Sequence, residues 1–573
     1  MFDLFRRHFL DHLLDRNGRV RVTADGAELV PEEGAHEVGR GQTEAGFVVP
    51  ADTRLRSGMS LERRPQIPVE GADVVLLDTQ TQRIHDTDQF LGLGIARACR
   101  RPEGIVGLFK AALLHQIARI LNIGQRGRGH QGESRDPSGP IHLGLLFSVS
   151  LLAAPAGAQP ITAEDFITFD ADQARLGQLL FYDKILSGNK NISCGTCHHH
   201  DLAGGDGVSL GIGEGGTGLG PKRLPGDGAD RIHKRIPRNA PALWNLGHKD
   251  VRVLFHDGRL EISDIYGNGY DSPAEEWLPQ GLETILAAQA LFPMTAQFEM
   301  AGNTGENEII GAVTDRIDLG WPILAKRVRT IPEYGRMFVA AFDHIDRPED
   351  VTIVEIGNAL AAFIGTEWAN YDSPYDAFLT AGTPLSEDAE RGRQLFFGDA
   401  RCAQCHNGPL LSDQDFHAMA LPPFGPGRTR RWDPIPRDVG RMGATDDLED
   451  AYRFRTPPLR NVALTAPYGH NGAYASLRDM VRHMADPVSM RTAWTPARAR
   501  LPEVPWLQEI DFVIQSDRLE MARHAATVDV RPVTLSDSQV DDIVAFLESL
   551  TGVTALERPL GRPDRVPSSL SVD

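Results

Sequence analysis

Hydrophobic and polar positions follow a helical period in two long stretches of the chain. In residues 353–368 (IVEIGNALAAFIGTEW) and 537–550 (DSQVDDIVAFLESL), apolar side chains recur at i, i+3, i+4 and i+7, as they do in amphipathic helices. Alternating strand patterns are scarce, and Gly- and Pro-rich loops fill residues 204–228 and 421–436. The pattern therefore predicts a mainly α fold with long irregular loops.

A second pattern occurs twice along the chain. Residues 175–181 (RLGQLLF) and 391–397 (RGRQLFF) each carry a glycine that is followed at the third and fourth positions by Leu-Phe. Each stretch precedes a C-x-x-C-H motif, and one of the two amphipathic helices follows each motif. The chain therefore repeats one unit. We place the boundary in residues 371–386, which are rich in Asp, Ser, Pro, Thr and Gly.

The C-x-x-C-H motif is the attachment signature of c-type haem. Its thiols form thioethers with the haem vinyl groups, and its histidine lies under the iron as the proximal ligand. A zinc site is disfavoured because neither pair has a second pair of ligands at finger spacing. We expect His199 and His200, which extend the first motif, to face solvent. The predicted attachment residues are Cys194, Cys197 and His198 for one haem and Cys402, Cys405 and His406 for the other.

The order of helix, haem motif, long loop and closing helix is that of a small cytochrome c domain. The predicted fold class is therefore mainly α, with two tandem cytochrome c-like haem domains and long irregular loops. The N-terminal domain spans residues 160–375, the C-terminal domain spans 385–555, and residues 556–573 form a tail.

Composition and charge exclude some classes of function. The 573 residues allow two to four domains at roughly 100–200 residues each. The formal net charge of −19 argues against nucleic-acid binding, because phosphate contacts need clustered Lys and Arg. An acidic surface suits a basic partner such as a small electron carrier. Only Cys99 lies outside the two haem motifs, so we expect no disulfide framework.

An apolar run at residues 143–158 (LGLLFSVSLLAAPAGA) follows the basic residues 126–135 and ends in an A-x-A cleavage pattern. This is typical of a secretory signal peptide, and it predicts export to the periplasm. The run is shorter than the ~20 apolar residues of a spanning helix. A signal belongs at an N-terminus, so residues 1–125 are either an over-extended start or a cytoplasmic extension with a short anchor. Both interpretations remain open.

With these motifs, the sequence resembles the bacterial dihaem cytochrome c peroxidase and MauG superfamily over about residues 164–555. Besides the two haem motifs, the resemblance rests on residues 238–241 (RNAP), 257–259 (DGR), 293–300 and 454–468 (FRTPPLRNVALTAPY). It implies a peroxide site at the N-terminal haem and an electron store at the C-terminal haem. It also implies hydrogen peroxide as substrate and a small cytochrome c or cupredoxin as electron donor. A homodimer is compatible with the sequence.

The resemblance also assigns site residues. Glu299 follows Pro293 at the family's spacing, so Glu299 is the expected acid/base above the N-terminal haem. A carboxylate in an apolar pocket has the pKa that moving a proton between the two peroxide oxygens requires. Met484 lies fourteen residues after His470, where the peroxidases carry a methionine ligand to the second iron and MauG-type proteins carry a tyrosine. Met480, one helical turn earlier, is the alternative.

The family holds a calcium ion between the haems, and its ligands match Asn239, Thr465 and Pro467.

Two departures from the family concern the N-terminal haem. His256 replaces the tryptophan before Asp-Gly-Arg that lies between the haems, and Trp244 is a candidate substitute. Gly213-Glu214 replaces a Gly-His motif whose histidine caps the peroxide iron in many peroxidases. We expect an open site, with His233 as the alternative cap.

These residues favour a dihaem peroxidase that a periplasmic carrier reduces. A MauG-like oxidase that modifies residues of a partner protein is the nearest alternative. A non-catalytic dihaem electron-transfer cytochrome is the alternative from a different class.

Overall fold

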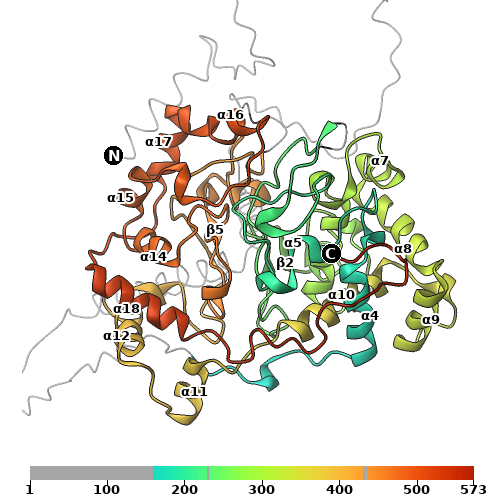
Figure 1. Cartoon of the computed structure of the whole chain (residues 1–573), viewed down its shortest axis with the longest axis horizontal. Coiled ribbons are helices and arrows are strands. Elements are labelled where there is room, and N and C mark those ends of the chain that lie inside the picture. Colours follow the sequence, from blue (N-terminus) through green and yellow to red (C-terminus); the bar gives the residue numbers. More distant parts are fainter. Residues whose placement is uncertain (1–158, 229–230, 430–432, 434) are drawn as a thin grey trace, which may run out of the picture. The chain divides into compact units, whose positions relative to one another are not determined.

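Helices carry most of the regular structure in the computed structural model, which describes residues 159–228, 231–429, 433 and 435–573 (Figure 1). Cys99, the extension 1–125 and the signal-like segment 126–158 lie outside the described residues. The described helices are α4 (Ala171–Tyr182), α5 (Cys194–Cys197), α6 (Ile285–Ala290), α7 (Glu308–Asp315), α8 (Trp321–Arg329), α9 (Pro332–Ala341), α10 (Ile353–Glu367), α11 (Pro374–Ala381), α12 (Glu387–Phe397), α13 (Met442–Thr445), α14 (Leu477–Ala485), α15 (Pro487–Thr492), α16 (Gln508–Asp511), α17 (Arg518–Ala526) and α18 (Asp537–Glu548).

The two helices predicted from apolar periodicity are α10 and α18. Both begin at a capping box, in which the N-cap side chain and the third helical side chain bond each other's backbone amides. Thr352 and Glu355 form this box for α10, and Ser536 and Gln539 form it for α18. The prediction of a mainly α fold is therefore confirmed.

A glycine sets the closest approach in each of two helix crossings, α4 on α10 and α12 on α18 (Figure 1). A Cβ at Gly177 of α4 would lie 1.8 Å from the carbonyl oxygen of Ala359 in α10. A Cβ at Gly392 of α12 would lie 1.8 Å from the carbonyl oxygen of Asp542 in α18. The repeated glycine in the sequence therefore marks a repeated crossing in which two helix backbones touch.

Short paired strands occur within the loops that connect the helices. Strands β1 (Val253–Leu254), β2 (Leu260–Ile262) and β3 (Tyr270–Asp271) form an antiparallel sheet in that order, and Glu261 pairs with both neighbouring strands. Strands β4 (Phe416–His417) and β5 (Phe454–Arg455) pair antiparallel, with Phe416 opposite Arg455. The turn between β1 and β2 carries residues 255–259, so the first sheet fixes the position of His256.

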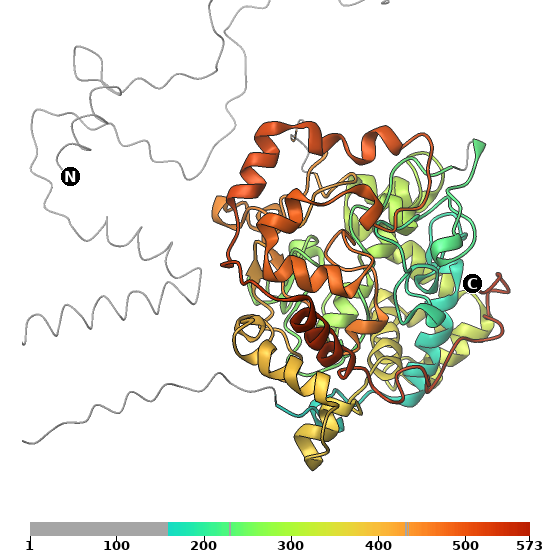
Figure 2. The ribbon, with the colours of Figure 1, turned by 60° about the vertical axis from the view of Figure 1, so that its left-hand side comes forward.

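Hydrophobic side chains gather in one large cluster in the N-terminal half and a smaller one around α11, α12 and α18. The last residues of the chain return to the first cluster. In Figures 1 and 2 the segment after α18 runs back to the N-terminal half, and in Figure 1 the C-terminus lies beside α5. Ala555 and Val566 are buried in that cluster, and Ser568 donates a hydrogen bond to Asp183. Residues 556–573, which the sequence marks only as a tail, are thus packed against the opposite half of the protein.

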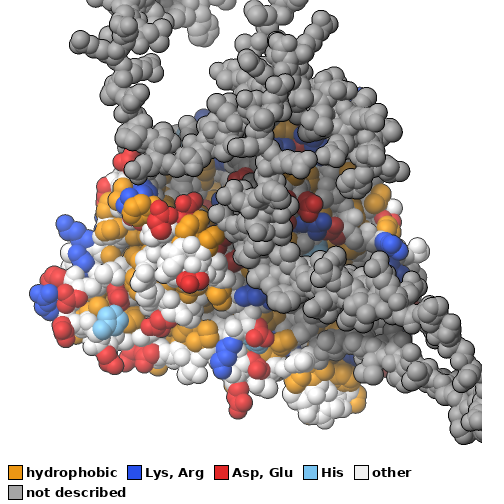
Figure 3. All heavy atoms as spheres, turned by 180° about the vertical axis from the view of Figure 1, so that it is seen from behind, with side chains coloured by type: hydrophobic (Ala, Val, Ile, Leu, Met, Phe, Trp, Pro, Cys, Tyr) orange, Lys and Arg blue, Asp and Glu red, His pale blue; other side chains and the backbone are white. Residues whose placement is uncertain are grey.

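Acidic, basic and hydrophobic side chains lie interspersed on the face drawn in Figure 3. Such a mixture is usual on protein surfaces, where apolar atoms still contribute much of the exposed area. Among the helices in the described part of the chain, none combines the length and apolar character needed to span a bilayer.

Candidate haem and peroxide sites

The histidines of the two C-x-x-C-H motifs are held in the same way. The backbone N–H of His198 donates to Cys194, and that of His406 donates to Cys402, both at 2.9 Å. Nδ1 of His198 lies 2.9 Å from the carbonyl oxygen of Gly204, and Nδ1 of His406 lies 2.9 Å from that of Leu411. Because Nδ1–H donates to a carbonyl, Nε2 of each ring keeps its lone pair for a metal.

The cysteines of the motifs are half-buried and form no disulfide. Burial raises the pKa of Cys194, Cys197 and Cys402 to about 12. Thiols with so high a pKa are poor nucleophiles and poor redox groups at neutral pH. Their paired placement next to an oriented histidine fits thioether attachment of a haem better than disulfide chemistry.

Beside the second motif lies a cavity of about 550 Å³. Cys402, Cys405, His406 and Met484 all line it, so the cavity brings the second motif and its expected distal ligand together. Arg455, which also lines it, donates to the carbonyl oxygens of Phe255 and Thr456, and burial lowers its pKa to about 10. A buried guanidinium bonded only to carbonyls fits an anionic group such as a haem propionate.

The cavity wall that carries Met484 is anchored by its neighbour His483. Nδ1 of His483 lies 2.9 Å from the Tyr474 hydroxyl, and its Nε2 lies 2.8 Å from the carbonyl oxygen of Met419. These contacts fix the last turn of α14. Met480 also lines the cavity, but it packs against a hydrophobic cluster that contains Trp494.

Glu299 lies in a π-helical turn, Gln297–Ala301, directly after the short 3-10 helix Pro293–Thr295. The side chain of Glu299 is half-buried, and burial raises its pKa while the charges of Arg259 and Arg428 lower it. The charge of Glu299 also contributes to the raised pKa of Cys197, which places this carboxyl within electrostatic reach of the first motif. Arg259, which the sequence offers only as part of a motif, thus acts electrostatically on Glu299.

Asp257 holds that arginine in place. The carboxylate of Asp257 is buried and forms ion pairs with Arg238 at 2.8 Å, Arg259 at 3.0 Å and Arg428 at 3.1 Å. Arg238 also bonds Asp438 at 2.7 Å. Burial opposes ionisation of Asp257, but the three guanidinium groups outweigh it and hold the pKa of Asp257 well below its usual range.

His256 lies at the edge of the cavity beside the second motif. Its Nε2 is 3.1 Å from the carbonyl oxygen of Asn239, and its own carbonyl accepts from the N–H of Arg455 at 2.8 Å. Burial and the charge of Arg238 lower the pKa of His256 to about 4. His256 is therefore neutral at pH 7.

The expected calcium ligands also lie on this cavity, which is lined by Asn239, Thr465 and Pro467. The Asn239 side chain donates from Nδ2 to the carbonyl of Val208 at 2.8 Å. The Thr465 hydroxyl donates to the carbonyl of Val462 at 3.0 Å. The Asn239 donation leaves its side-chain oxygen available to a hard cation, and the expected ligands from Thr465 and Pro467 are backbone oxygens.

The expectation that His199 and His200 face solvent is wrong. His199 is only 4 % exposed, because Nδ1 accepts from the N–H of Asp201 and the turn packs on itself. His200 is mostly buried and lies 3.6 Å from Glu367. His233, the alternative cap, is exposed and lies close enough to Glu306 to lower the pKa of that carboxyl.

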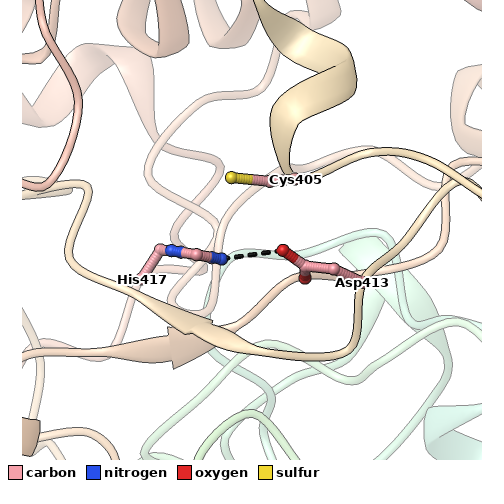
Figure 4. A group of neighbouring side chains, drawn as sticks. All are labelled: Cys405, Asp413 and His417. Carbon is pink, nitrogen blue, oxygen red and sulfur yellow. Dashed lines mark hydrogen bonds and ion pairs between the residues drawn. The ribbon is translucent and has the colours of Figure 1, made fainter. Parts of the chain in front are cut away.

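Figure 4 shows Cys405, Asp413 and His417 pointing toward one another at the start of the second unit. The Asp413 carboxylate bonds His417 Nε2 at 2.9 Å and raises the pKa of His417 to about 10, with Cys405 adding to the shift. Cys405 belongs to the second C-x-x-C-H motif, so we assign this group as an ion pair beside that motif and not as a separate metal site.

Two C-x-x-C-H turns with the same histidine contacts, each following the first helix of a crossing, and a cavity beside one of them are the features of a haem protein with two cofactor sites. The family model for di-haem cytochrome c peroxidase matches residues 171–383. Cytochrome c551 peroxidase of Nitrosomonas europaea is 30 % identical over 346 residues, which cover 60 % of this chain and 81 % of the relative. The chain belongs to the di-haem cytochrome c peroxidase family. It is a haem-dependent oxidoreductase with two haem cofactors.

Other members of the superfamily are also similar. The methylamine utilization protein MauG of Paracoccus denitrificans is 27 % identical over 434 residues, which cover 72 % of this chain and 95 % of the relative. The crystal structure of the diheme peroxidase BthA from Burkholderia thailandensis is 23 % identical, with a TM-score of 0.46, and the match covers 70 % of this chain and 91 % of that structure.

Proposed function

We propose that this protein is a periplasmic c-type peroxidase that reduces hydrogen peroxide with electrons from a small redox protein. The observation that carries the proposal is the position of Glu299, a half-buried carboxyl with a raised pKa within electrostatic reach of the first haem motif. In this proposal two tandem cytochrome c-like domains, residues 160–375 and 385–555, hold one haem each.

The cysteines would hold the haems through thioethers, at Cys194 and Cys197 in the first domain and at Cys402 and Cys405 in the second. His198 and His406 would be the proximal ligands, since each ring is oriented by a carbonyl at 2.9 Å. When bound, the haems supply the iron that binds peroxide and the store that delivers electrons. The remaining steps depend on side chains of this chain.

Glu299 would move the proton. As a carboxylate it would take the proton from the inner peroxide oxygen, and as a carboxylic acid it would give that proton to the outer oxygen. The outer oxygen could then leave as water when the O–O bond breaks, with the electrons for that cleavage coming from the haems and, in the end, from the external donor. Burial raises the pKa of Glu299, which makes its carboxylate a stronger acceptor for the peroxide proton. The charge of Arg259 opposes this effect of burial on the pKa. Pro293 would fix the start of the turn that carries Glu299.

We also propose that the peroxide site is open at rest. Glu214, which occupies the position of the capping histidine, accepts hydrogen bonds from Asn189 at 2.8 Å and Asn191 at 2.6 Å. Its carboxylate is therefore already engaged. The exposure of His233 and its proximity to Glu306 support the same proposal.

Met484 would be the distal ligand of the second haem, because Met480 already packs into a hydrophobic cluster. A thioether ligand raises the potential of a haem, which suits an electron store. Substitution of Met484 by Ala should lower the midpoint potential of one haem only, and Met480→Ala should leave both potentials unchanged. Spectroelectrochemical titration of both variants measures this, and the reverse pattern would assign the ligand to Met480.

We propose that Asn239, Thr465 and Pro467 bind a calcium ion. This ion would connect the wall of the second cavity to the segment that carries His256. Export through residues 143–158 would deliver the chain to the periplasm, where c-type haem is attached. The net charge of −19 supports a basic electron donor.

Replacing Glu299 by Gln tests the peroxidase proposal. The amide keeps the shape but cannot accept the proton, so peroxide-dependent oxidation of a reduced cytochrome should fall by roughly 10²–10⁴-fold. Haem content and both midpoint potentials should not change. Glu276→Gln is the matched control, since Glu276 is an exposed glutamate of the same half. Full activity in the Glu299→Gln variant would refute the role of this carboxyl.

A MauG-like oxidase is the second candidate, and its supporting observations are the 95 % coverage of the MauG relative and the replacement of tryptophan by His256. Such an enzyme would consume peroxide while oxidising residues of a partner protein. Peroxide consumption without oxidation of any small cytochrome or cupredoxin would favour it over the peroxidase.

A further inference from the structure

A loop of the C-terminal half, residues 425–441, binds the turn between β1 and β2 of the N-terminal half. The guanidinium of Arg428 forms an ion pair with the Asp257 carboxylate at 3.1 Å, although the two residues are 171 positions apart. Nη1 of Arg441 donates to the carbonyl oxygen of Gly258 at 2.5 Å. Both halves of the protein therefore contribute to the surroundings of this turn.

Glycines allow the close approach of this loop and this turn. Gly258 has a φ of +63°, and a Cβ there would lie 2.1 Å from Cζ of Phe416 and 2.6 Å from Nη1 of Arg441. Gly427, next to Arg428, has a φ of +57°, and its Cβ would lie 2.4 Å from the carbonyl carbon of Arg437. Backbone of this conformation with no room for a Cβ requires glycine. The backbone around Arg428 and around its partner Asp257 is thus fixed on both sides of the ion pair.

The same turn fixes the side chain of Arg259. Asp257 binds its guanidinium at 3.0 Å, and the ring of Phe255 lies under it, with 3.6 Å from the guanidinium carbon to the ring centroid. Phe255 packs edge-on against Phe292, which directly precedes the short helix that leads to Glu299. A continuous set of contacts therefore joins the C-terminal loop to the segment that carries the expected acid/base.

Both guanidinium groups act on Glu299. Burial raises the pKa of Glu299, and the charges of Arg259 and Arg428 lower it. The side chain of Arg259 is 17 % exposed and that of Arg428 is 36 % exposed, so solvent screens the second charge more than the first. The thiol of Cys197 also lies within electrostatic reach, but as a thioether it would carry no charge.

The ion-pair cluster around Asp257 carries one positive charge in excess. It contains three guanidinium groups and two carboxylates, joined by ion pairs of between 2.7 and 3.1 Å: Arg238, Arg259, Arg428, Asp257 and Asp438. The arginines hold the pKa of both carboxyl groups below the usual range, so both are ionised. An ionised Glu299 would balance the remaining positive charge.

We propose that Arg428 of the C-terminal half is a positioning residue of the peroxide site in the N-terminal half: it holds the pair of Asp257 and Arg259 in place and, with Arg259, keeps Glu299 in the form that accepts a proton. This inference rests on the proposed function, since it takes Glu299 as the group that moves the peroxide proton. The path of the proton stays as proposed above. The peroxide site is then complete only when the loop 425–441 is bound to the turn.

The pH profile of peroxide-dependent cytochrome oxidation by the two-haem holoprotein tests this proposal. Arg428→Gln removes a charge that lowers the pKa of Glu299, so this pKa should rise. A protonated carboxyl cannot accept the peroxide proton, so turnover falls as the pH falls through the pKa of Glu299. The acid limb of the profile should therefore move to higher pH. Turnover at the acid end should fall several-fold more than at the alkaline end.

Two further variants at the same position separate charge from packing. Arg428→Lys keeps the positive charge and should largely restore the wild-type profile. Arg428→Met is a second neutral variant that keeps a long aliphatic side chain, and it should move the acid limb in the same direction as Arg428→Gln. Asp257 keeps Arg238 at 2.8 Å and Arg259 at 3.0 Å in all three variants, so its buried carboxylate stays paired.

Arg518→Gln is the matched control, because Arg518 is an exposed arginine of α17 in the same half of the protein. It also removes one positive charge, and its pH profile should be that of the wild type. Haem content and both midpoint potentials should be those of the wild type in every variant, which separates an altered charge from a disturbed fold.

An acid limb that does not move in Arg428→Gln would overturn the proposal. Equal shifts in Arg428→Gln and Arg428→Lys would overturn it as well, since the charge would then not be the cause. Full activity in Glu299→Gln would overturn the proposed proton transfer and the role of Arg428 with it. Lost activity in Glu299→Gln combined with an unmoved limb in Arg428→Gln would overturn the role of Arg428 alone.

Discussion

Replacing Gly177 by Ala tests whether direct backbone contact between α4 and α10 builds the fold. The new Cβ would lie 1.8 Å from the carbonyl oxygen of Ala359 and 2.9 Å from Cβ of Phe363. Carbon atoms normally keep about 3.5–4.0 Å, so the two helices must separate by more than about 1 Å. Overpacking of this kind costs about 1–3 kcal/mol, which exceeds the roughly 1 kcal/mol that Ala gains over Gly within a helix.

Gly311→Ala is a control for which we expect the opposite change in the free energy of unfolding. Gly311 also lies inside a helix, α7, but a Cβ there meets nothing within 4 Å. Gly311→Ala should therefore stabilise the protein by about 0.5–1 kcal/mol through helix propensity alone. The two variants should differ by about 1–3 kcal/mol in the free energy of unfolding, because both gain helix propensity and only Gly177→Ala meets the overpacking cost.

Chemical denaturation followed by far-UV circular dichroism measures this difference, and equal slopes in denaturant are needed for the comparison. Gly392→Ala should resemble Gly177→Ala, because its Cβ would meet the carbonyl oxygen of Asp542 at the same distance. Equal stability of Gly177→Ala and Gly311→Ala would refute the claim that the two backbones touch at this crossing.

Three further predictions concern stability. Asp511→Asn should destabilise the protein by about 3–5 kcal/mol, because it leaves the buried guanidinium of Arg235 without its carboxylate, and denaturant unfolding measures this loss. Asp413→Asn should destabilise the protein by about 1 kcal/mol below pH 6.5. Since the folded pKa of His417 is raised to about 10, thermal unfolding should show the gap to the wild type closing as the pH rises toward that value. Ser536→Ala removes the N-cap bond of α18 and should cost about 1 kcal/mol, whereas Ser536→Thr should cost much less in the same assay.

Local patterns in the sequence predicted the parts of the fold that local interactions build. The amphipathic period of residues 353–368 and 537–550 predicted α10 and α18, because one apolar face must be buried and each helix carries its own capping box. The repeated glycine predicted a repeated unit, although only the structure shows that its role is close contact between two helix backbones.

Features that depend on distant residues could not be predicted. His199 looked like a surface residue beside a haem motif, but it is buried, and the charges of Arg562 and Asp573 from the distant C-terminal segment act on its ring. The segment 556–573 has no strong apolar period, and only its contacts with Asp183 and Glu367 hold it against the other half.

In the candidate site, too, some features follow from local sequence and others depend on residues far apart in the chain. Motif and spacing in the sequence are enough to propose the haem-attachment residues and Met484. The sequence alone could not assign roles to Arg259, which acts on the charge of Glu299, or to Arg455, which lines the second cavity. Their positions depend on ion pairs and on strand pairing between residues that are far apart in the chain. Trp244 was a candidate in the sequence, but its contact with Arg558, more than three hundred residues away along the chain, could not be predicted.

The most direct test of the central claim is peroxide-dependent oxidation of a reduced small cytochrome by the fully oxidised, purified holoprotein, with its haem content measured on the same sample. We predict two haems per chain and immediate turnover without prior reduction, because in our proposal neither Glu214 nor His233 caps the peroxide site. Turnover that begins only after one-electron reduction would contradict the open site. Two bound haems with no turnover in either state would contradict the peroxidase itself.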